Sequence, residues 1–177
     1  MFSILVFRVC MVVFFVLAAL GLGDWKNWEK YYPTVLFTMV VNLAAGFLSY
    51  HHILWNYNPD ALVKTQTTVE MINAFIMLPA TTFVYLSKFP SNCRLYQYGY
   101  ILLWVFIYGC LEYIDSELIG GLSYKNGWSW PVSVIFDVGM FSILRLHHLR
   151  PLLGWAVTFL VAAFVLTVFN FGPAEMK

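Results

Sequence analysis

Charged residues are absent from long stretches of this chain. Residues 31–50 and 151–174 contain no Asp, Glu, Lys or Arg, and residues 71–87 and 95–111 are also free of them. Because a helix rises about 1.5 Å per residue, roughly 20 apolar residues cross the ~30 Å hydrocarbon layer of a bilayer. Repeated segments of this length predict a multi-pass membrane protein.

The composition agrees with this prediction. The chain has 177 residues, of which 61% are hydrophobic and only 11% are charged, against about 25% charged residues in soluble domains. The spans leave no room for a separate soluble domain, so we expect a single transmembrane helical domain over residues 1–177. The net charge of +1 and the lack of a polybasic run argue against nucleic acid as a partner.

Helix-breaking signals divide the chain into six predicted spans. Pro33, Pro131 and Pro151 fall near the start of a span, where the missing N–H leaves no helical hydrogen bond unmade. We therefore expect an all-α polytopic bundle of six transmembrane helices. The predicted spans are residues 3–22, 34–53, 69–87, 98–116, 131–146 and 152–170.

Three local signals refine these boundaries. Asn58-Pro59-Asp60 has the pattern of a helix N-cap, so the third helix is expected to begin near Pro59, ahead of its span. Pro79 lies inside the third span and should kink the helix and free the carbonyl of Phe75. Asn126-Gly127 predicts a tight turn before the fifth span.

The distribution of Lys and Arg predicts an orientation. Loops one, three and five hold six of these residues, and the other side holds four, counting Arg8, which lies in the first span and should snorkel or form an ion pair. The side richer in Lys and Arg faces the cytoplasm in most membrane proteins. We therefore expect both termini outside the cell and the first segment to be a retained helix rather than a cleaved signal.

Six crossings would place the end of span two, the start of span three, the end of span four and the start of span five on the same side of the membrane. Acidic residues gather at these four helix ends. Asp137 lies six residues beyond Pro131, about 9 Å along the helix axis. Ionisable groups at such depth are costly, usually face the bundle interior and indicate function. The other residues at these four helix ends are His52, Glu70, Glu112 and Asp115.

Helical angles of about 100° per residue decide which of these side chains can converge. Glu112 shares one stripe with Asp115, and Glu70 shares another with Asn73. His52 lies at the flank of a small and polar stripe on the second span. The predicted ion- or ligand-binding site therefore comprises Asp137, Glu112, Asp115, Glu70, His52 and Asn73.

This residue set suits a proton relay, and its donors are also ligands for Zn, Mn or Fe. Carboxyl groups held together at low dielectric cannot all stay ionised, which suits coupling to protons or cations. The simpler alternative is that the acids lie at headgroup level, solvated or paired with Lys64 or Lys125. The HHxR stretch at residues 147–150 is expected to meet lipid phosphates. No catalytic motif is present, and neither a cofactor nor a particular metal is indicated.

Several short motifs resemble a group of uncharacterised small multi-pass proteins from spore-forming Gram-positive bacteria. The resemblance covers Tyr31 to Trp155 and implies an all-helical fold in the bacterial plasma membrane, without implying an activity. Its motifs are Tyr32-Pro33-Thr34, Leu54-Trp55, Pro79, Asn126-Gly127-Trp128, and Leu146-His147 with Pro151 and Trp155.

Three classes of function follow from these observations. We favour the handling of protons or a small cation or solute through the acidic cluster. An intramembrane enzyme acting on a lipid, with His52, Glu112 and Asp115 as metal ligands or acid–base groups, is one alternative. A membrane scaffold or interaction subunit is the other. The expected partners are the lipid bilayer, a proton or small cation, and a second copy of the chain.

Overall fold

The computed structural model describes residues 2–91 and 93–171, and each predicted span overlaps a long helix over most of its length. A two-stranded antiparallel ribbon, β1 (Trp55–Tyr57) with β2 (Leu122–Tyr124), is added to this all-helical framework. The short η1 (Trp25–Lys30) is a 3₁₀ turn. The long helices are α1 (Phe2–Leu22), α2 (Tyr32–Leu48), α3 (Gln66–Ile72) continuing through η2 (Asn73–Met77) into α4 (Leu78–Ser87), α5 (Arg94–Tyr113) continuing into η3 (Ile114–Ile119), α6 (Trp130–Leu149) and α7 (Pro151–Val168).

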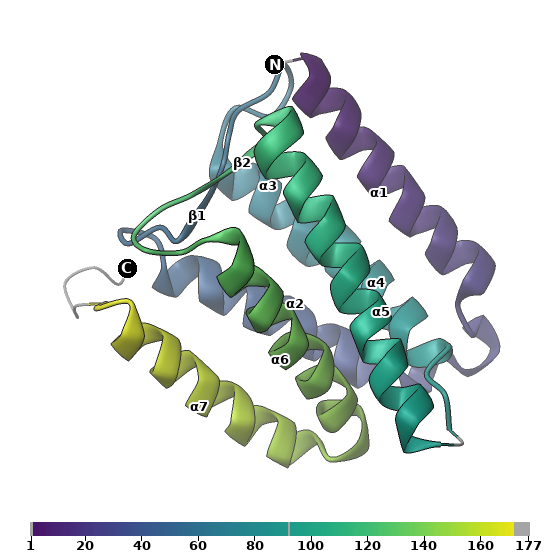
Figure 1. Ribbon diagram of the computed structural model, residues 1–177. Helices are drawn as coiled ribbons and strands as arrows, with labels where there is room; N and C mark the ends of the chain where they lie inside the picture. Colours follow the sequence, from purple (N-terminus) through teal and green to yellow (C-terminus); the bar gives the residue numbers. More distant parts are fainter. Residues whose placement is uncertain (1, 92, 172–177) are drawn as a thin grey trace.

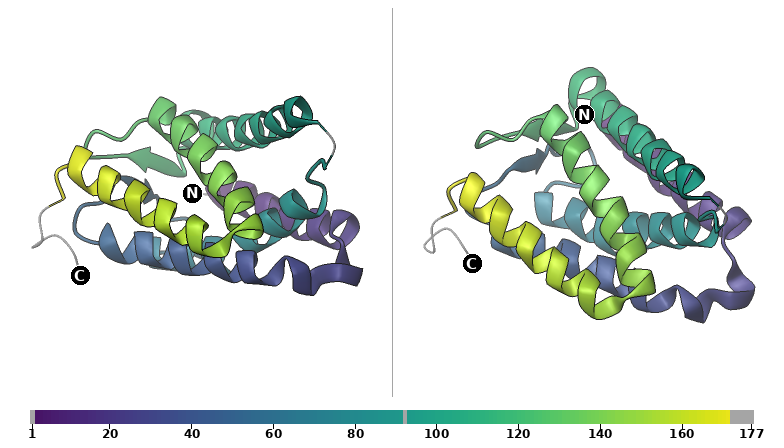
Figure 2. Two further views of the ribbon diagram at one scale, coloured as in Figure 1. Left: turned by 90° about the horizontal axis from the view of Figure 1, so that it is seen from below. Right: turned by 60° about the horizontal axis from the view of Figure 1, so that its bottom comes forward.

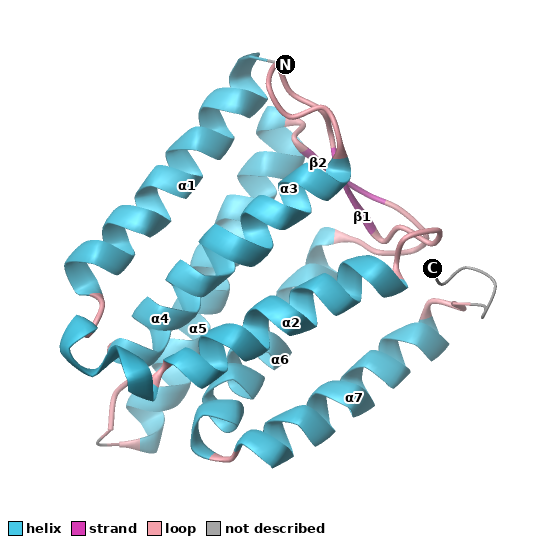
Figure 3. Cartoon of the chain, turned by 180° about the vertical axis from the view of Figure 1, so that it is seen from behind, coloured by secondary structure: helices cyan, strands magenta, loops and turns pink. Residues whose placement is uncertain are grey.

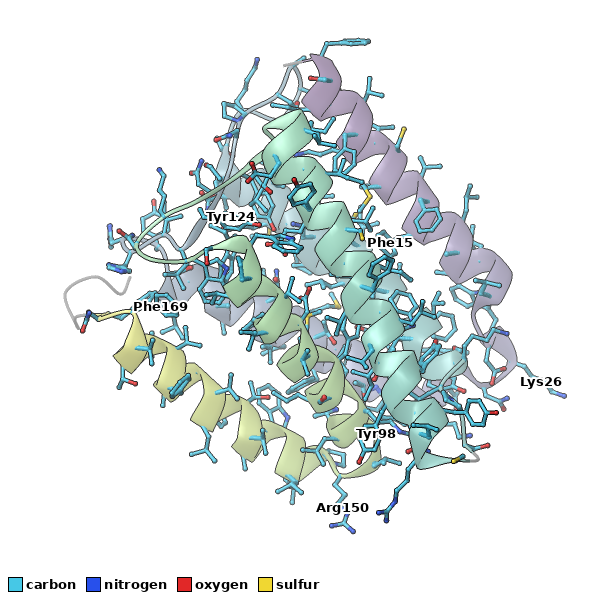
Figure 4. The ribbon with its side chains drawn as sticks, viewed as in Figure 1. Phe15, Lys26, Tyr98, Tyr124, Arg150 and Phe169 are labelled. Carbon is cyan, nitrogen blue, oxygen red and sulfur yellow. The ribbon has the colours of Figure 1, made fainter. Side chains whose placement is uncertain are left out.

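The long helices run between two ends of the bundle (Figures 1 and 2). Loops 49–65 and 120–129 lie at one end, together with the start of α1 and the finish of α7 (Figure 3). We call this the acidic end. The opposite, basic end carries η1, the connection after α4 and the α6–α7 turn; Figure 4 labels Lys26, Tyr98 and Arg150 there. Both ends of the described chain therefore lie at the same end of the bundle (Figure 1).

The helix α4 forms the centre of the bundle. All residues from Thr81 to Leu86 are buried. The fully buried Tyr85 donates a 2.9 Å hydrogen bond to the carbonyl of Phe141 and stacks on Tyr100. This contact ties α4 to α6 and α5 through an aromatic core, and satisfies a phenol that would be costly to bury alone.

Helices α1 and α7 lie at the periphery and expose apolar side chains outward. In the most apolar stretch of each helix, only 6% of the residues of α7 and 17% of those of α1 are buried, against 50% in the Gln66–Ser87 helix. Exposed apolar surfaces of this extent are compatible with contact with lipid. Large exposed residues on these two helices include Phe14, Leu17, Leu20, Leu152, Phe159, Leu160 and Phe164.

Within residues 2–91 and 93–171, four helices are long and apolar enough to cross a membrane: α1, the Gln66–Ser87 helix, α6 and α7. The apolar α2 is shorter, with 17 residues, and α5 carries Arg94, Gln97 and Glu112 among several tyrosines. These features are compatible with a membrane protein, and the six-span topology stays a prediction.

Two predicted helix boundaries are wrong. The second helix ends at Leu48 rather than at residue 53 because the following chain turns away to form β1, which pairs with β2. The third helix begins at Gln66, not near Pro59, with the Thr65 hydroxyl accepting the N–H of Thr68 at 3.3 Å. A distant strand partner and a competing N-cap therefore outweigh the local signals.

The proline signals at the start of three spans and the turn signal at Asn126-Gly127 are confirmed. Pro33, Pro131 and Pro151 stand in the first two positions of α2, α6 and α7. The helix distortion ahead of Pro79 is a π-helical turn, η2, which widens the backbone before the residue that lacks an N–H. Asn126 and Gly127 both have positive φ, and the N–H of Trp128 closes the turn on the carbonyl of Lys125 at 3.0 Å.

The prediction that the HHxR stretch meets lipid phosphates is wrong for its first histidine. His147 is buried, its Nδ1 lies 3.0 Å from the Thr34 hydroxyl, and its ring stacks on Phe37. Gly154 of α7 packs directly against it. His147 therefore joins α2, α6 and α7, while the half-buried His148 stacks on Tyr31.

Candidate functional site

A cavity of about 510 Å³ lies in the half of the bundle nearer the acidic end. Its walls come from α1, the α3–η2 region, α5 with η3, α6 and the β1–β2 ribbon, and most of the lining side chains are apolar. Phe15, labelled in Figure 4 between α1 and α5, lines it from α1. The polar lining residues are Arg8, Asn42, Tyr57, Asp60, Asn73, Tyr108, Glu112, Asp115, Ser133 and Asp137.

Asp137 faces the bundle interior, as predicted from its depth along the fifth span. Its side chain lines the cavity from α6 and is only 7% exposed. Among the described residues, no group forms a hydrogen bond with its Oδ2 atom. Native proteins rarely leave a buried polar atom unpaired, so this oxygen is suited to receive a proton or an external ligand.

Glu112 is held in place by a short hydrogen-bonded chain. The indole N–H of Trp128 donates to the Ser133 hydroxyl at 3.1 Å, and that hydroxyl donates to Glu112 Oε1 at 2.5 Å. Glu112 also lies close enough to Asp137 for the two carboxyl groups to interact electrostatically. These two hydrogen bonds orient one oxygen of Glu112 and leave its carboxyl group at the cavity wall.

Asp115 enters the cavity from the π-helical turn that follows α5. Its Oδ1 atom is buried and has no hydrogen-bond partner within the part of the chain that the structure describes. A Cβ at Gly121 would displace this carboxyl group from its position, so the glycine allows the 120–129 loop to approach Asp115 closely. π-helical turns often mark functional positions, and both η2 and η3 contribute lining residues.

Asn73 lies on η2 and lines the same cavity, where its side chain interacts with the Tyr57 hydroxyl. Burial raises the pKa of Tyr57 above its usual value, and the nearby carboxyl groups of Glu112 and Asp115 raise it further. Tyr57 in β1 therefore remains a neutral hydrogen-bond donor beside the acidic residues at physiological pH.

Two of the predicted site residues lie outside the cavity. Glu70 accepts a hydrogen bond from Gln66 at 2.7 Å and faces the space above Gly46 of α2, so it belongs to a helix–helix contact. His52 lies beyond the end of α2, where its ring packs against Phe171. The helical-angle argument for His52 fails because the backbone there is not helical.

Arg8 does not pair with Asp137. Its guanidinium donates to Asp60 Oδ2 at 2.6 Å and to the Asn58 carbonyl at 2.7 Å, and it reaches the Gly121 carbonyl at 3.4 Å. One side chain of α1 thus joins both loops of the acidic end.

Asp60 is fully buried and accepts the backbone N–H groups of Leu62 and Val63, each at 2.7 Å. Burial alone would raise the pKa of Asp60, but these hydrogen bonds and the Arg8 guanidinium outweigh that effect and hold the pKa below its usual value. The pair is therefore ionised at neutral pH and closes one edge of the cavity.

The residues of the candidate site are thus Asp137, Glu112, Asp115 and Asn73, with Tyr57, Ser133 and the Arg8–Asp60 pair around them. Helical periodicity had indicated Glu112, Asp115 and Asn73, and depth along the helix had indicated Asp137. Nothing local indicated Tyr57, which reaches the site through a strand paired with residues 65 or more positions away. Their roles in binding stay a prediction.

The arrangement of donors bears on the metal alternative. Within residues 2–91 and 93–171, no three His, Cys, Asp or Glu side chains converge closely enough to hold a metal ion. The three cysteines are free and lie apart from the cavity. The site therefore offers carboxyl groups in an apolar enclosure rather than a preformed ligand set.

Comparison of the chain with protein-family models, with curated proteins and with solved structures finds no match. The arguments for function therefore rest on the geometry of the cavity.

Proposed function

We propose that this protein is a multi-pass membrane protein that binds and transfers protons, or a small cationic solute, through the carboxyl-lined cavity. The observation that carries the proposal is the buried Oδ2 of Asp137, which faces the cavity without a hydrogen-bond partner among the described residues. Glu112 and Asp115 add two further carboxyl groups to the same enclosure. Groups of this kind inside membrane helices serve proton and ion pathways.

The six-span topology with both termini outside belongs to this proposal. Helical segments at all six predicted positions, four of them long and apolar enough to span a bilayer, support it. The excess of Lys and Arg at the basic end supports a cytoplasmic position for that end. The resemblance to small membrane proteins of spore-forming bacteria supports the bacterial plasma membrane as the location.

Proton movement into proteoliposomes tests the proposal. Full-length protein is reconstituted into liposomes that enclose a pH-sensitive dye. A potassium gradient with valinomycin sets the membrane potential. We expect the Asp137→Asn substitution to lower the initial rate at least about tenfold, the factor that about 1.4 kcal/mol of lost stabilisation produces.

The matched control is Glu117→Gln, because Glu117 is an exposed carboxyl group near Asp115 that does not line the cavity. This variant should retain the wild-type rate. Equal rates in wild type, Asp137→Asn and protein-free liposomes would overturn the proposal and favour a scaffold.

A further inference from the structure

We infer that the cavity binds a hydrophobic monovalent cation, one with an apolar body and a single positive centre, which enters from the bilayer. This inference rests on the proposed function and names the class of solute that the same site takes. It depends on the apolar lining, the excess of carboxyl groups, and the position of the cavity mouth.

The volume and lining of the cavity suit an apolar body rather than a hydrated inorganic ion. At about 510 Å³, the cavity falls within the range of about 300–1,000 Å³ that holds drug-sized ligands. Val12, Met77 and Met140 are among its many apolar lining residues. An apolar wall cannot replace the water shell of a small ion, but it gains free energy by covering a hydrophobic ligand.

The charges in the cavity favour a positive centre. Four carboxyl groups line it against one guanidinium, which is already paired with Asp60. Glu112, Asp115 and Asp137 form no salt bridge with any described residue. A bound cation would stabilise the ionised form of these carboxyl groups, whereas an anion of the same size would destabilise it.

Aromatic side chains in the same wall strengthen this preference. Tyr57, Tyr108 and Trp128 line the cavity close to the carboxyl groups. The faces of such rings attract quaternary and other organic cations. Recognition of the cationic centre can therefore combine carboxyl groups with aromatic rings.

Two residues of the cavity wall also lie on the outer surface of the bundle, in the middle of α1. Val9 and Val13 of α1 line the cavity and are also 50% and 49% exposed. Because α1 runs along the outer edge of the bundle (Figure 1) and is one of its apolar, mostly exposed helices, we place the entrance of the cavity on the surface that is compatible with lipid. A ligand already dissolved in the membrane can reach the carboxyl groups by this route.

Equilibrium binding of radiolabelled tetraphenylphosphonium to the full-length protein in detergent tests the inference. We expect saturable binding that unlabelled tetraphenylphosphonium displaces. Tetraphenylborate, an anion of nearly the same shape, should not displace it, and tetramethylammonium, a cation without the apolar body, should do so at least about a hundredfold more weakly. These comparisons use the wild-type chain and do not depend on the folding of a variant.

The role of the buried carboxyl group is tested with the variants described above. Asp137→Asn should weaken binding at least about tenfold, and Glu117→Gln should leave it within about twofold of wild type. Absence of saturable binding, or equal displacement by the phosphonium and the borate, would overturn the inference. If Asp137-dependent proton movement persists in that case, the ligand class is wrong and the proposed function stands; loss of both overturns both.

Discussion

Replacing Arg8 with leucine is expected to lower the free energy of unfolding by about 3–5 kcal/mol. The substitution leaves the Asp60 carboxylate fully buried without its cationic partner, and breaking a buried ion pair in this way costs about that much. It also removes the donors to the Asn58 and Gly121 carbonyls. Chemical unfolding of the full-length protein in detergent, followed by circular dichroism, measures the change.

A double variant separates the loss of the pair from the loss of the arginine itself. Arg8→Leu with Asp60→Asn removes the uncompensated charge but keeps an oxygen for the N–H groups of Leu62 and Val63, so it should recover part of the lost stability. Arg150→Leu, a change at an exposed arginine outside this network, is the control and should have little effect. An Arg8→Leu variant as stable as wild type would contradict the structural role of the pair.

The same pair predicts how stability responds to acid. Because the pKa of Asp60 is lower in the folded chain than in the unfolded chain, its contribution is fully present above the unfolded pKa, near 4, and disappears as the pH falls through the folded value. Wild type should therefore lose more stability than the Arg8→Leu, Asp60→Asn variant when the pH is lowered from 5 to 3. Parallel losses in the two proteins would contradict this assignment.

Replacing Gly154 with alanine should lower the free energy of unfolding by about 1–3 kcal/mol, the usual cost of forcing an extra methyl group into a packed interface. A Cβ at this position would lie 2.6 Å from the Cα of His147, so the backbones of α6 and α7 would have to separate. The separation would also disturb the His147 contacts with Thr34 and Phe37. The same unfolding measurement in detergent detects it.

Gly139→Ala provides the matched control for this change. Gly139 is also helical, in α6, but a Cβ there would meet nothing within 4 Å. Alanine is the better helix former, so this variant should be as stable as wild type or up to about 1 kcal/mol more stable. If both glycine variants behave alike, helix propensity rather than the close approach to His147 determines the result.

Much of the fold follows from local physical chemistry. Apolar segments long enough to satisfy their own backbone groups must form helices in a membrane, and the prolines at Pro33, Pro131 and Pro151 mark where three of them begin. The alternation of helix direction along the chain then brings the acidic helix ends to one end of the bundle (Figure 1). The 3.6-residue period further predicts that Asp137 and Ser133 share a face of α6, and both are buried there.

The remaining features depend on contacts between distant residues. His52 was placed by extending a helix that in fact ends at Leu48, and Glu70 turns toward Gly46 because that glycine leaves space for it. The partner of Arg8 is 52 residues away in the sequence. No local pattern indicates such a choice among carboxylates, because it is made by the packing of loops that have no regular period.

The β1–β2 ribbon has a consequence for how the chain is completed during synthesis. Residues 55–57 obtain their strand partner only when residues 122–124 have been made, so the backbone N–H and C=O groups that pair across the ribbon stay without their native bonds while the next two long helices are synthesised. The Gly121 contact with Arg8 becomes available at the same moment. Once Tyr124 has been translated, α1, loop 49–65 and loop 120–129 can form their native contacts with one another. On a ribosome stalled before that point, we expect proteases to cut the nascent chain readily in residues 49–65.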